Sequence, residues 1–533
     1  MKTPLPSRAK KPTPKTEQPP ATRRKASKPS CATRPTTKLD VFVFGSGENC
    51  ELGLGPRHTN APRPRLNALL DADAVGVVQL AVGGMHCVAL THDGKVLTWG
   101  VNDDGALGRE KPPAGSEAEE DDDDILDAFE STPAAVSFGE DIDVMQVAAT
   151  NSACFVLTAE GSVYGWGSFA GADGNFGFLH EKPPQTTERT PVPIPGLRGV
   201  RQLAGGSNHI LALTTDGNVL AWGSGEQNEL GRRILARRRF ETLVPRRVGL
   251  PRNKTAKIFA GSHHSFAIDT AGKVWAFGLN NFGQCGIPTR EDTGFTTVIA
   301  PTVVKSLEGY SIRHIGCGLH HSIACTEEGD VVVWGRCDDG QMGLSLDAVP
   351  RDHIIFDSRD RPRVLNVPTI VPGLKVVFTA AGIDNCLTIS KDGELSAWGF
   401  SASYNTGLAT TDTVTTPTIV RSKQLGQKKL SVVAAGGQFA VATSPRLLDV
   451  LSFCTQLLSV WVSGSNDSSR FQMVCRVSMA VVMKPQGVAI MSLLSRSRIH
   501  ARLSGSDAPA PARKDGQHVA LKLGSSSEMA DRW

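Results

Sequence analysis

The 533-residue sequence lacks a C-x-x-C pair, an N-terminal apolar segment and any uninterrupted apolar run long enough to cross a bilayer. Its eleven cysteines are an odd number scattered along the chain, which favours a reducing compartment over a disulfide framework. The N-terminus is basic and proline-rich, unlike a secretory signal. The most apolar stretch, residues 447–462, is too short and too interrupted to span a membrane. These absences predict a soluble intracellular protein with no membrane partner.

Patterns of covalent catalysis are also scarce. No glycine-rich loop has phosphate-binding spacing, because "GSGEQNELG" (223–231) recurs in variant form along the chain and its glycines serve turns. Neighbouring histidines near cysteines leave a metal-dependent enzyme open as an alternative: His263 with His264, and His320 with His321 near Cys317 and Cys325. The second histidine of each pair occupies a repeated position, which favours packing and hydrogen bonding over metal ligation. We therefore expect no metal and no cofactor.

What the sequence does contain is a repeat. An aromatic residue followed by glycine recurs seven times, at Phe44, Trp99, Trp166, Trp222, Phe277, Trp334 and Trp398. Most complete copies are close to the pattern AGG-x-H-x-x-AL-x-x-DG-x-V-x-x-WG. The residue thirteen positions before the aromatic, here called the histidine position, is His86, Ala153, His209, His264, His321 or Asn385. Since this step never varies while other spacings do, it marks one rigid unit.

Each unit is predicted to be a β-hairpin. Apolar alternation flanks pairs such as Asp93-Gly94 and Asp216-Gly217, which suit the positive φ of a tight hairpin turn. A small antiparallel sheet cannot bury both faces alone, and repeats of this length with one aromatic per unit are typical of a β-propeller. Seven copies predict an all-β, seven-bladed propeller.

The two ends of the repeat region are incomplete in complementary ways. The chain opens its repeats with "LDVFVFGSGENCELGLG" (39–55), a second half without a first. It ends them with "VVAAGGQFAVATS" (432–444), a first half that has Phe439 at the histidine position and no aromatic-glycine pair after it. Joining the two halves closes a ring and leaves no open sheet edge. The alternative is two degenerate repeats that never meet.

Charge divides the chain into three parts. Residues 1–38 hold eleven Lys/Arg, one acid and eight prolines, which predicts a disordered basic tail. Residues 39–444 are predicted to be the propeller, with a net charge of −11, and seven acids lie in "EAEEDDDD" (117–124) within an acidic loop at 109–143. Residues 445–533 have no repeat pattern and are predicted to be a disordered extension.

A basic tail on an acidic body predicts two kinds of partner. The tail suits DNA or nucleosomes, because cationic side chains bind phosphates without regard to base sequence. The residues expected to bind are Arg8, Lys10, Lys11, Arg23, Arg24 and Lys25. The same basic motifs suit nuclear import, and hence an importin. The alternative is that both charged segments only keep the chain soluble.

Function in a repeat protein is expected where the repeat is broken. The distance from each aromatic-glycine pair to the glycine that ends the following turn is eight residues in six repeats, but ten in the third, from Gly167 to Gly177. The longer turn, "GSFAGADGNFG", predicts a protrusion. Hairpin topology places it on one face with polar residues before the histidine position: Asn151, Asn208, His263, His320 and Asp384.

These motifs carry a family resemblance. The segments "VLAWGSGEQNELGRR", "VWAFGLNNFGQCG" and "GSVYGWGSF" resemble the regulator of chromosome condensation family, the guanine-nucleotide exchange factors of the small GTPase Ran. The acidic loop and "LGRRILARRRFETLVPRR" (230–247) resemble its fungal members. The likeness covers about residues 39–444. It implies a monomeric, chromatin-associated nuclear protein that serves nucleocytoplasmic transport and mitosis.

The resemblance also implies a mechanism without covalent chemistry. A wedge in the third repeat would press against the nucleotide-binding region of Ran, expel the nucleotide and hold the empty GTPase until another nucleotide binds. The implied exchange residues are Phe169, Ala170, Gly171, Ala172, Asp173, Gly174, Asn175 and Phe176, with His320 and His321. The implied partner-binding residues are Glu48, His86, Asn151, Asn208, Arg237, His263 and Asp384.

Composition gives the wedge a physical basis. Four residues of 168–176 are Gly or Ala, so its backbone can approach another backbone closely. Phe169 and Phe176 are expected to anchor its base, and Asp173 is expected to compete for groups that hold phosphate or magnesium. Three positions depart from the family pattern: Asn151 and Asn208, where the family often has Asp, and Ala170, where it usually has a basic residue. A decorative loop on a scaffold propeller without exchange activity is the alternative.

Overall fold

The computed structural model describes residues 33–111, 125–289 and 296–446. The acidic run 117–124, the predicted DNA-binding residues (Arg8, Lys10, Lys11, Arg23, Arg24 and Lys25) and nearly all of the predicted extension lie outside these ranges. The described chain is strand, turn and loop apart from α1 (Ala128–Ser131) and five short 3-10 helices: η1 (Ala68–Leu70), η2 (Ala236–Leu243), η4 (Lys305–Leu307), η5 (Leu346–Ala348) and η6 (Arg351–His353). The predicted all-β class is therefore confirmed. No helix in the described ranges is long and apolar enough to cross a membrane.

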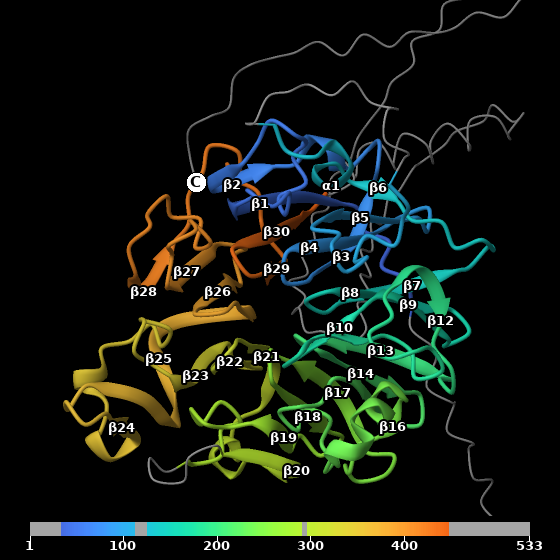
Figure 1. The fold of residues 1–533 in the computed structure, drawn as a ribbon. Helices are drawn as coiled ribbons and strands as arrows, with labels where there is room; N and C mark the ends of the chain where they lie inside the picture. Colours follow the sequence, from blue (N-terminus) through green and yellow to red (C-terminus); the bar gives the residue numbers. More distant parts are fainter. Residues whose placement is uncertain (1–32, 112–124, 290–295, 447–533) are drawn as a thin grey trace, which may run out of the picture. The chain divides into compact units, whose positions relative to one another are not determined.

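The second to fifth repeats each form an antiparallel four-stranded sheet (Figure 1). The second contains β3 (Val77–Val82), β4 (His86–Thr91), β5 (Val96–Gly100) and β6 (Ala134–Ala135). The third contains β7 (Val144–Ala149), β8 (Ala153–Thr158), β9 (Val163–Gly167) and β12 (Glu188–Pro193). The fourth contains β13 (Val200–Gly205), β14 (His209–Thr214), β15 (Val219–Gly223) and β16 (Arg246–Arg247). The fifth contains β17 (Thr255–Ala260), β18 (His264–Asp269), β19 (Val274–Leu279) and β20 (Thr297–Val303).

The sixth and seventh repeats share one long strand. The 20-residue β25 (Pro362–Ala381) pairs with β23 through its first part and with β26 through its last part. The sixth repeat supplies β21 (Ile312–Cys317), β22 (His321–Thr326), β23 (Asp330–Arg336) and β24 (Ile354–Phe356). The seventh supplies β26 (Asn385–Ser390), β27 (Leu395–Gly399) and β28 (Val414–Ile419). These strands therefore belong to one eight-stranded sheet.

The remaining four-stranded sheet combines the two ends of the repeat region. Its strand order is β2 (Asn60–Leu66), β1 (Leu39–Ser46), β30 (Phe439–Pro445) and β29 (Val432–Ala435). β1 and β30 pair over seven residues, from Leu39 with Pro445 to Gly45 with Phe439. The incomplete first repeat and the incomplete last repeat thus meet in one sheet, and the alternative in which they stay apart is wrong.

Strand register explains the constant thirteen-residue step. In each hairpin the residue at the histidine position pairs with the glycine of the aromatic-glycine pair, as His209 does with Gly223 and His321 with Gly335. Phe439 and Gly45 form the same pair across the two chain ends. The predicted hairpins are confirmed, and their tight-turn glycines have positive φ, such as 88° at Gly94 and 75° at Gly217.

The glycine after each aromatic residue is required by a close backbone approach. At Gly223 the φ angle is +130°, and a Cβ would lie 2.3 Å from the carbonyl oxygen of Asn208. That same carbonyl accepts a hydrogen bond from the amide of Ser224, at 2.8 Å. Equivalent hydrogen bonds recur in every repeat, for example Arg336 to His320 at 2.9 Å. Because any side chain would enter this contact, only glycine fits the position.

The core of the described residues consists of seven apolar clusters, each between neighbouring repeats. One contains Val43 of β1 with Trp99 of β5, and another contains Phe155 of β8 with Trp222 of β15. The cluster that contains Phe44 also contains Leu387 of β26, so the last repeat packs against the sheet that holds the first strand. Each sheet is thus covered by its neighbours, which buries the apolar faces that one small sheet would expose.

Candidate functional site

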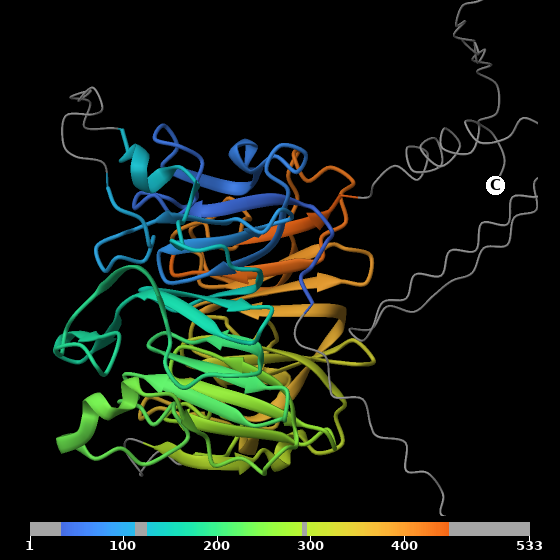
Figure 2. The same ribbon diagram turned by 90° about the vertical axis from the view of Figure 1, so that its right-hand side faces the viewer.

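The long third turn forms a separate hairpin. β10 (Phe169–Gly171) pairs with β11 (Gly174–Gly177), and Ala172 and Asp173 form the tip. In Figure 2 the hairpin and η2 both project on the side of the sheets away from the strand that leads to residue 33. The protrusion predicted from the two extra residues is therefore present as an ordered two-stranded element.

The base of this hairpin is anchored in the core. Phe169 is fully buried and Phe176 is 3% exposed, as expected from the sequence. The ring of Phe169 stacks 6.1 Å from that of Phe155 and 5.7 Å from that of Phe178, measured between centroids. The edge of Trp222 meets Phe155 at 5.9 Å. The aromatic cluster fixes where the hairpin leaves the third sheet.

Trp222 lacks the hydrogen bond that the other buried indoles make. Four tryptophans each donate from Nε1 to a carbonyl oxygen in the turn of the preceding repeat: Trp99 to Glu51 at 3.0 Å, Trp166 to Ala106 at 2.8 Å, Trp334 to Gln284 at 2.9 Å and Trp398 to Gln341 at 2.8 Å. The turn before Trp222 is the long third turn, and the buried Nε1 of Trp222 has no partner among the described residues. The extra residues therefore remove a contact that the regular turn supplies.

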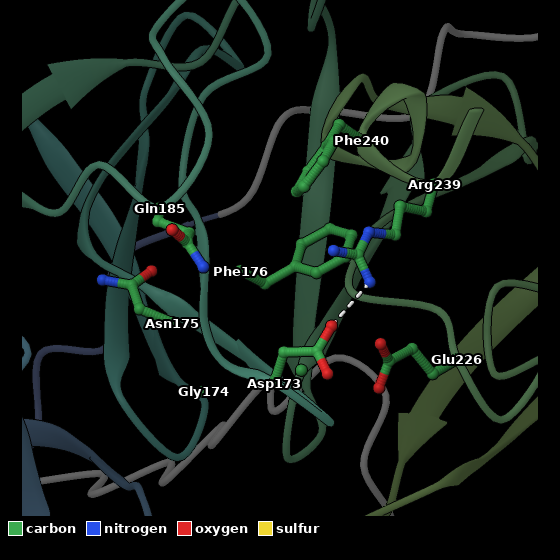
Figure 3. Close-up of a pocket in the computed structure, with 9 residues that line it drawn as sticks. Asp173, Gly174, Asn175, Phe176, Gln185, Glu226, Arg239 and Phe240 are labelled. Atoms are coloured by element: carbon green, nitrogen blue, oxygen red, sulfur yellow. Dashed lines mark hydrogen bonds and ion pairs between the residues drawn. The ribbon is translucent and has the colours of Figure 1, made fainter. Parts of the chain in front are cut away.

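The tip of the hairpin rests on side chains of the fourth repeat (Figure 3). Nη1 of Arg239 lies 2.9 Å from the Asp173 carboxylate. The amide of Ala172 donates to Oε2 of Glu226 at 2.8 Å. The ring of Phe176 lies 5.1 Å from the ring of Phe240, and Figure 3 shows these side chains around one shallow pocket. Asp173 is thus engaged by a cation of this chain.

The predicted partner-binding residues differ in their relation to the hairpin. Asn208 contacts the hairpin itself, because its Oδ1 accepts from the amide of Ala170 at 3.0 Å. Glu48 and Arg237 are exposed. The Asn151 prediction needs correction, because the carbonyl equivalent to that of Asn208 belongs to Ser152, which accepts from the Ser168 amide at 3.0 Å. Asn151 lies one residue earlier and is exposed.

A charged cluster lies between the end of the sixth hairpin, at Arg336, and the start of the seventh, at Asn385. Arg336 forms ion pairs with Asp338 and Asp339, both at 2.6 Å, and with Asp384 at 3.4 Å. The ring of His320 lies 4.8 Å from that of Phe282. Burial, with the nearby Arg336 charge, lowers the pKa of His320 to about 4. His320 is therefore neutral at physiological pH and can offer a ring nitrogen to a partner.

His320 and His263 are partly buried. Nδ1 of each ring is buried without a partner among the described residues, as is Nδ1 of the interior His209, His264 and His321. Burial also lowers the pKa of His263. Other parts of both side chains are exposed, as is part of Asp384. A partner can therefore reach His263, His320 and Asp384 without entering the core.

The histidines at the repeated position are interior. His86 is 1% exposed, and His209, His264 and His321 are fully buried. His209 and His264 contact serine hydroxyls of the next repeat, Ser265 and Ser322, both at 2.8 Å. Burial lowers the pKa of His86 and of His321 to about 4. His86 and His321 therefore do not lie on the partner-facing surface, contrary to the expectation from sequence.

These histidines do not form a metal centre. In the described parts of the chain, no group of three or more His, Cys, Asp or Glu side chains could hold a metal ion. The eight cysteines of the same ranges are free thiols, seven of them buried. Cys386 contacts Nε2 of His321 at 3.3 Å, which continues the histidine-to-next-repeat contacts. The second histidine of each pair, His264 or His321, serves packing between repeats.

The repeat architecture matches a known family. The family model described as an RCC1-like domain covers residues 40–442. The chain belongs to the RCC1-like family. Among relatives, Protein pim1 of Schizosaccharomyces pombe is 41% identical over 76% of this chain and 75% of that protein. Guanine nucleotide exchange factor SRM1 of Saccharomyces cerevisiae is 36% identical over 77% of this chain and 88% of that protein.

Solved structures of this RCC1-like family agree. Prp20p from Saccharomyces cerevisiae, described with its binding properties to Gsp1p and histones, has a TM-score of 0.72 and 33% identity over 80% of this chain and 97% of its own. Yeast RCC1 (Prp20) bound to Kap60 has a TM-score of 0.73 and 32% identity over 84% of this chain and 99% of its own. The predicted family membership is confirmed.

Three residues at the RCC1-like hairpin were not predicted. Glu226, Arg239 and Phe240 contact its tip, although the sequence indicated only the basic cluster around Arg237. Glu226 lies inside "GSGEQNELG", which was read as an ordinary turn. One signal was present in the sequence. The basic segment "ARRRF" (236–240) follows the turn of the fourth repeat, which comes directly after the irregular third repeat.

Proposed function

We propose that this protein is a guanine-nucleotide exchange factor that promotes GDP/GTP exchange on the small GTPase Ran at chromatin. The observation that carries the proposal is the likeness to SRM1, a guanine nucleotide exchange factor, along most of both chains. The protein serves nucleocytoplasmic transport and mitosis, and it acts as a monomer in the nucleus. A propeller scaffold without exchange activity is the competing function.

The seven repeats form one seven-bladed propeller. Neighbouring sheets share apolar clusters, and the cluster of Phe44 with Leu387 links the seventh repeat to the first. Pairing of β1 with β30 closes the ring, and β25 serves both the sixth and the seventh blade. Residues 1–38 and 445–533 are appendages of the propeller at 39–444.

Exchange needs no covalent step. Hairpin β10–β11 enters the nucleotide-binding region of Ran and weakens its hold on the nucleotide. Linkage requires the converse, so nucleotide binding weakens the hold of the exchange factor on Ran to the same extent. The factor therefore catalyses exchange in both directions, and the cellular excess of GTP sets the outcome. The small residues of the hairpin suit close approach, and its buried base suits a rigid wedge.

The rest of the face holds the GTPase. Asn208, His263, His320 and Asp384 contact Ran, with Glu48 and Arg237 at the edge. The partial exposure of His263 and His320 supports this assignment, because a partner can reach these side chains. Ser152 replaces Asn151 as the third-repeat member of this face. Ala170 contributes its backbone amide, which Asn208 already engages.

Chromatin and an importin are the other partners. Prp20p is described with histones and Gsp1p, and yeast RCC1 (Prp20) is bound to Kap60. In this chain the basic tail at 1–38 binds DNA or nucleosomes through Arg8, Lys10, Lys11, Arg23, Arg24 and Lys25, and it engages an importin. These contacts explain how a protein with an acidic body is retained in the nucleus on chromatin.

Release of labelled GDP from Ran tests the function. The exchange factor accelerates release at catalytic concentrations, and a chelator applied to the factor alone before mixing leaves the rate unchanged. A scaffold binds Ran without accelerating release, which would contradict the proposal. A chelator-sensitive factor would instead support the metal-dependent alternative.

A further inference from the structure

We propose that Glu226 and Arg239 of the fourth repeat are positioning residues that hold the tip of hairpin β10–β11 in the orientation needed for nucleotide release. The inference rests on the proposed exchange function and deepens it. It adds two residues that would not have to touch Ran and that act through the hairpin.

The first support is that the regular turn anchor is missing. In the other described turns that precede a tryptophan, a main-chain carbonyl accepts from the indole of the next repeat, as Ala106 does from Trp166 at 2.8 Å. The hairpin offers no such acceptor, and Nε1 of Trp222 is left without a partner in the described chain. Its tip must therefore be held by other contacts.

The second support is that the replacement contacts come from the next repeat. Asn208 Oδ1 accepts from the Ala170 amide at 3.0 Å, near the base of the hairpin. Glu226 Oε2 accepts from the Ala172 amide at 2.8 Å, and Arg239 forms its ion pair with Asp173 at 2.9 Å. These contacts reach successive points from base to tip. They favour one height and one tilt of the hairpin relative to the fourth repeat.

The third support is that Arg239 is itself held in place. Its guanidinium carbon lies 4.9 Å from the centre of the Phe240 ring, and Phe240 packs on Phe176 of β11 at 5.1 Å. The Arg239 carbonyl accepts from the hydroxyl of Thr242, whose side chain is buried. The cation is thus supported from the core side of η2 and directed at the tip.

Glycine at the hairpin leaves room for this arrangement. A Cβ on Gly171 would lie 3.1 Å from Oε1 of Glu226 and 3.0 Å from Cδ2 of Phe176. At Gly174, where φ is +98°, a Cβ would meet nothing within 4 Å. Strand β10 is therefore crowded at Gly171 by the fourth repeat, and β11 is engaged at Asn175, whose Nδ2 donates to Oγ1 of Thr187 at 2.8 Å. The hairpin is open at Gly174, beside its tip, where a partner can approach.

The strength of each tip contact is modest. Arg239 and Asp173 are 41% and 69% exposed, and an exposed ion pair shifts a two-state equilibrium only about twofold to fivefold. Such a hold biases the hairpin towards one orientation without locking it. A catalytic element that is preorganised in this way loses turnover when the bias is removed, because its productive geometry is populated less often.

Amide hydrogen exchange in the free protein tests the hold itself. In Glu226→Ala the Ala172 amide should exchange about twofold to fivefold faster, whereas Glu226→Gln keeps an acceptor oxygen and should preserve protection. Arg239→Ala should also speed exchange at Ala172, and Arg247→Ala, an exposed arginine on β16, should not. Unchanged protection at Ala172 in both Glu226→Ala and Arg239→Ala would overturn the proposal.

Kinetics of GDP release from Ran test the consequence. Arg239→Ala and Glu226→Ala should each lower kcat about twofold to fivefold, with KM for Ran within about twofold of the parental value. Arg239→Lys and Glu226→Gln should recover most of the loss, because each retains the interacting group. A rise in KM with kcat unchanged would mean that these side chains bind Ran directly. Parental kcat despite a loosened hairpin would refute the positioning role.

The two proposals fail separately. If the hairpin is not the exchange element, its replacement by a regular turn leaves GDP release unchanged, whatever the amide data show. If the hairpin is the exchange element but Glu226 and Arg239 do not position it, replacement removes most of the acceleration of GDP release while both alanine variants keep parental kcat. Nucleosomes are omitted from these assays, so that chromatin binding by the basic tail at 1–38 does not affect the measured rates.

Discussion

Gly407, in the turn of the seventh repeat, lies directly against the ring of Phe44 in β1. A Cβ at Gly407 would be 2.8 Å from Cδ2 of that ring. The same contact recurs between consecutive repeats, as with Gly53 and Trp99 or Gly343 and Trp398. The turn of the seventh repeat therefore packs on β1 in the same way as other turns pack on the repeat that follows them.

This contact predicts a specific cost for Gly407→Ala. Gly373 is the matched control, because its φ of +74° is close to the +71° of Gly407 but a Cβ there would meet nothing within 4 Å. Both substitutions carry the penalty of a left-handed alanine, and only the first also crowds Phe44. Thermal or denaturant unfolding should show Gly407→Ala about 1–3 kcal/mol less stable than Gly373→Ala. Equal stability would mean that the two ends are not packed together.

Truncations at the two chain ends should behave differently. Removal of residues after Ser444 leaves most of β30 and should give a folded, active protein, whereas removal of residues 39–45 deletes most of β1 from the middle of its sheet. The second change exposes two strand edges and should lower the melting temperature sharply. A large loss of melting temperature on removal of the C-terminal segment would contradict the assigned closing strand.

Replacement of the long turn should separate stability from exchange. Exchanging "SFAGADGNF" (168–176) for "SGEQNEL", the turn of the fourth repeat, restores regular spacing and a carbonyl for Nε1 of Trp222. The variant should fold but be less stable than the parent, because it loses the buried rings of Phe169 and Phe176. It should bind Ran weakly through the remaining face and lose most of its acceleration of GDP release. Melting curves and labelled-GDP release are the measurements. Parental exchange by a folded variant would remove the hairpin from the mechanism.

The buried carboxyl of Glu229 should make stability depend on pH. Burial raises its pKa to about 7, and its Oε2 accepts from the Gln227 amide at 2.7 Å. The equivalent positions in the fifth and sixth repeats hold Gln284 and Gln341. Their uncharged side chains accept the equivalent hydrogen bond from the amide two residues earlier.

The sign follows from proton binding. A carboxyl whose folded pKa exceeds its unfolded value binds more protons when folded, so its contribution to stability falls as pH rises from the unfolded pKa through about 7. Glu229→Gln should therefore become more stable relative to the parent from pH 5 to pH 8, by at most about 1.4 kcal/mol for each unit of pKa difference. Denaturant unfolding at several pH values measures this, with exposed Glu160→Gln as the control. A constant difference across the range would contradict the prediction.

Removal of residues 1–32 should weaken nucleosome binding and spare exchange. The cut is placed before Arg34, because its guanidinium donates to the Val144 carbonyl at 2.8 Å and pairs with Asp143. Affinity should depend steeply on salt in the parent and weakly in the truncated chain, since fewer phosphate contacts release counterions. The readout is nucleosome affinity at low and moderate salt beside GDP release. Equal salt dependence in the two proteins would contradict the assignment.

The repeat could be predicted from sequence because backbone geometry dictates it. The thirteen-residue step reflects strand register, in which His209 pairs with Gly223, and the aromatic-glycine pair reflects a contact that excludes every Cβ. These constraints recur in each repeat, so they appear as a pattern. The protrusion was predictable for the same reason, because two extra residues break a constant spacing.

The remaining site residues depend on contacts that the repeat pattern does not predict. Asn151 lies one residue before Ser152, the true equivalent of Asn208. The sequence does not show this offset, because "TNSA" (150–153) has Thr150 where other repeats have the second glycine of AGG. His86 and His321 were placed on the partner face, although register turns them inward. The Asp173–Arg239 contact joins two irregular segments of different repeats, and residue spacing contains no information about such a meeting.

The sheet that joins the two ends of the repeat region also determines when β1 can be paired during synthesis. β1 is among the first strands to leave the ribosome, yet its partner β30 is the last strand of the repeat region. Until translation has passed residue 445, β1 has an unpaired edge and Phe44 lacks the turn that covers it. A nascent chain stalled before that point therefore exposes a buried-type strand, LDVFVFGS, which is a substrate for chaperones and for wrongly paired neighbours. The sheet that contains β1 can therefore form completely only after residue 445 has been synthesised.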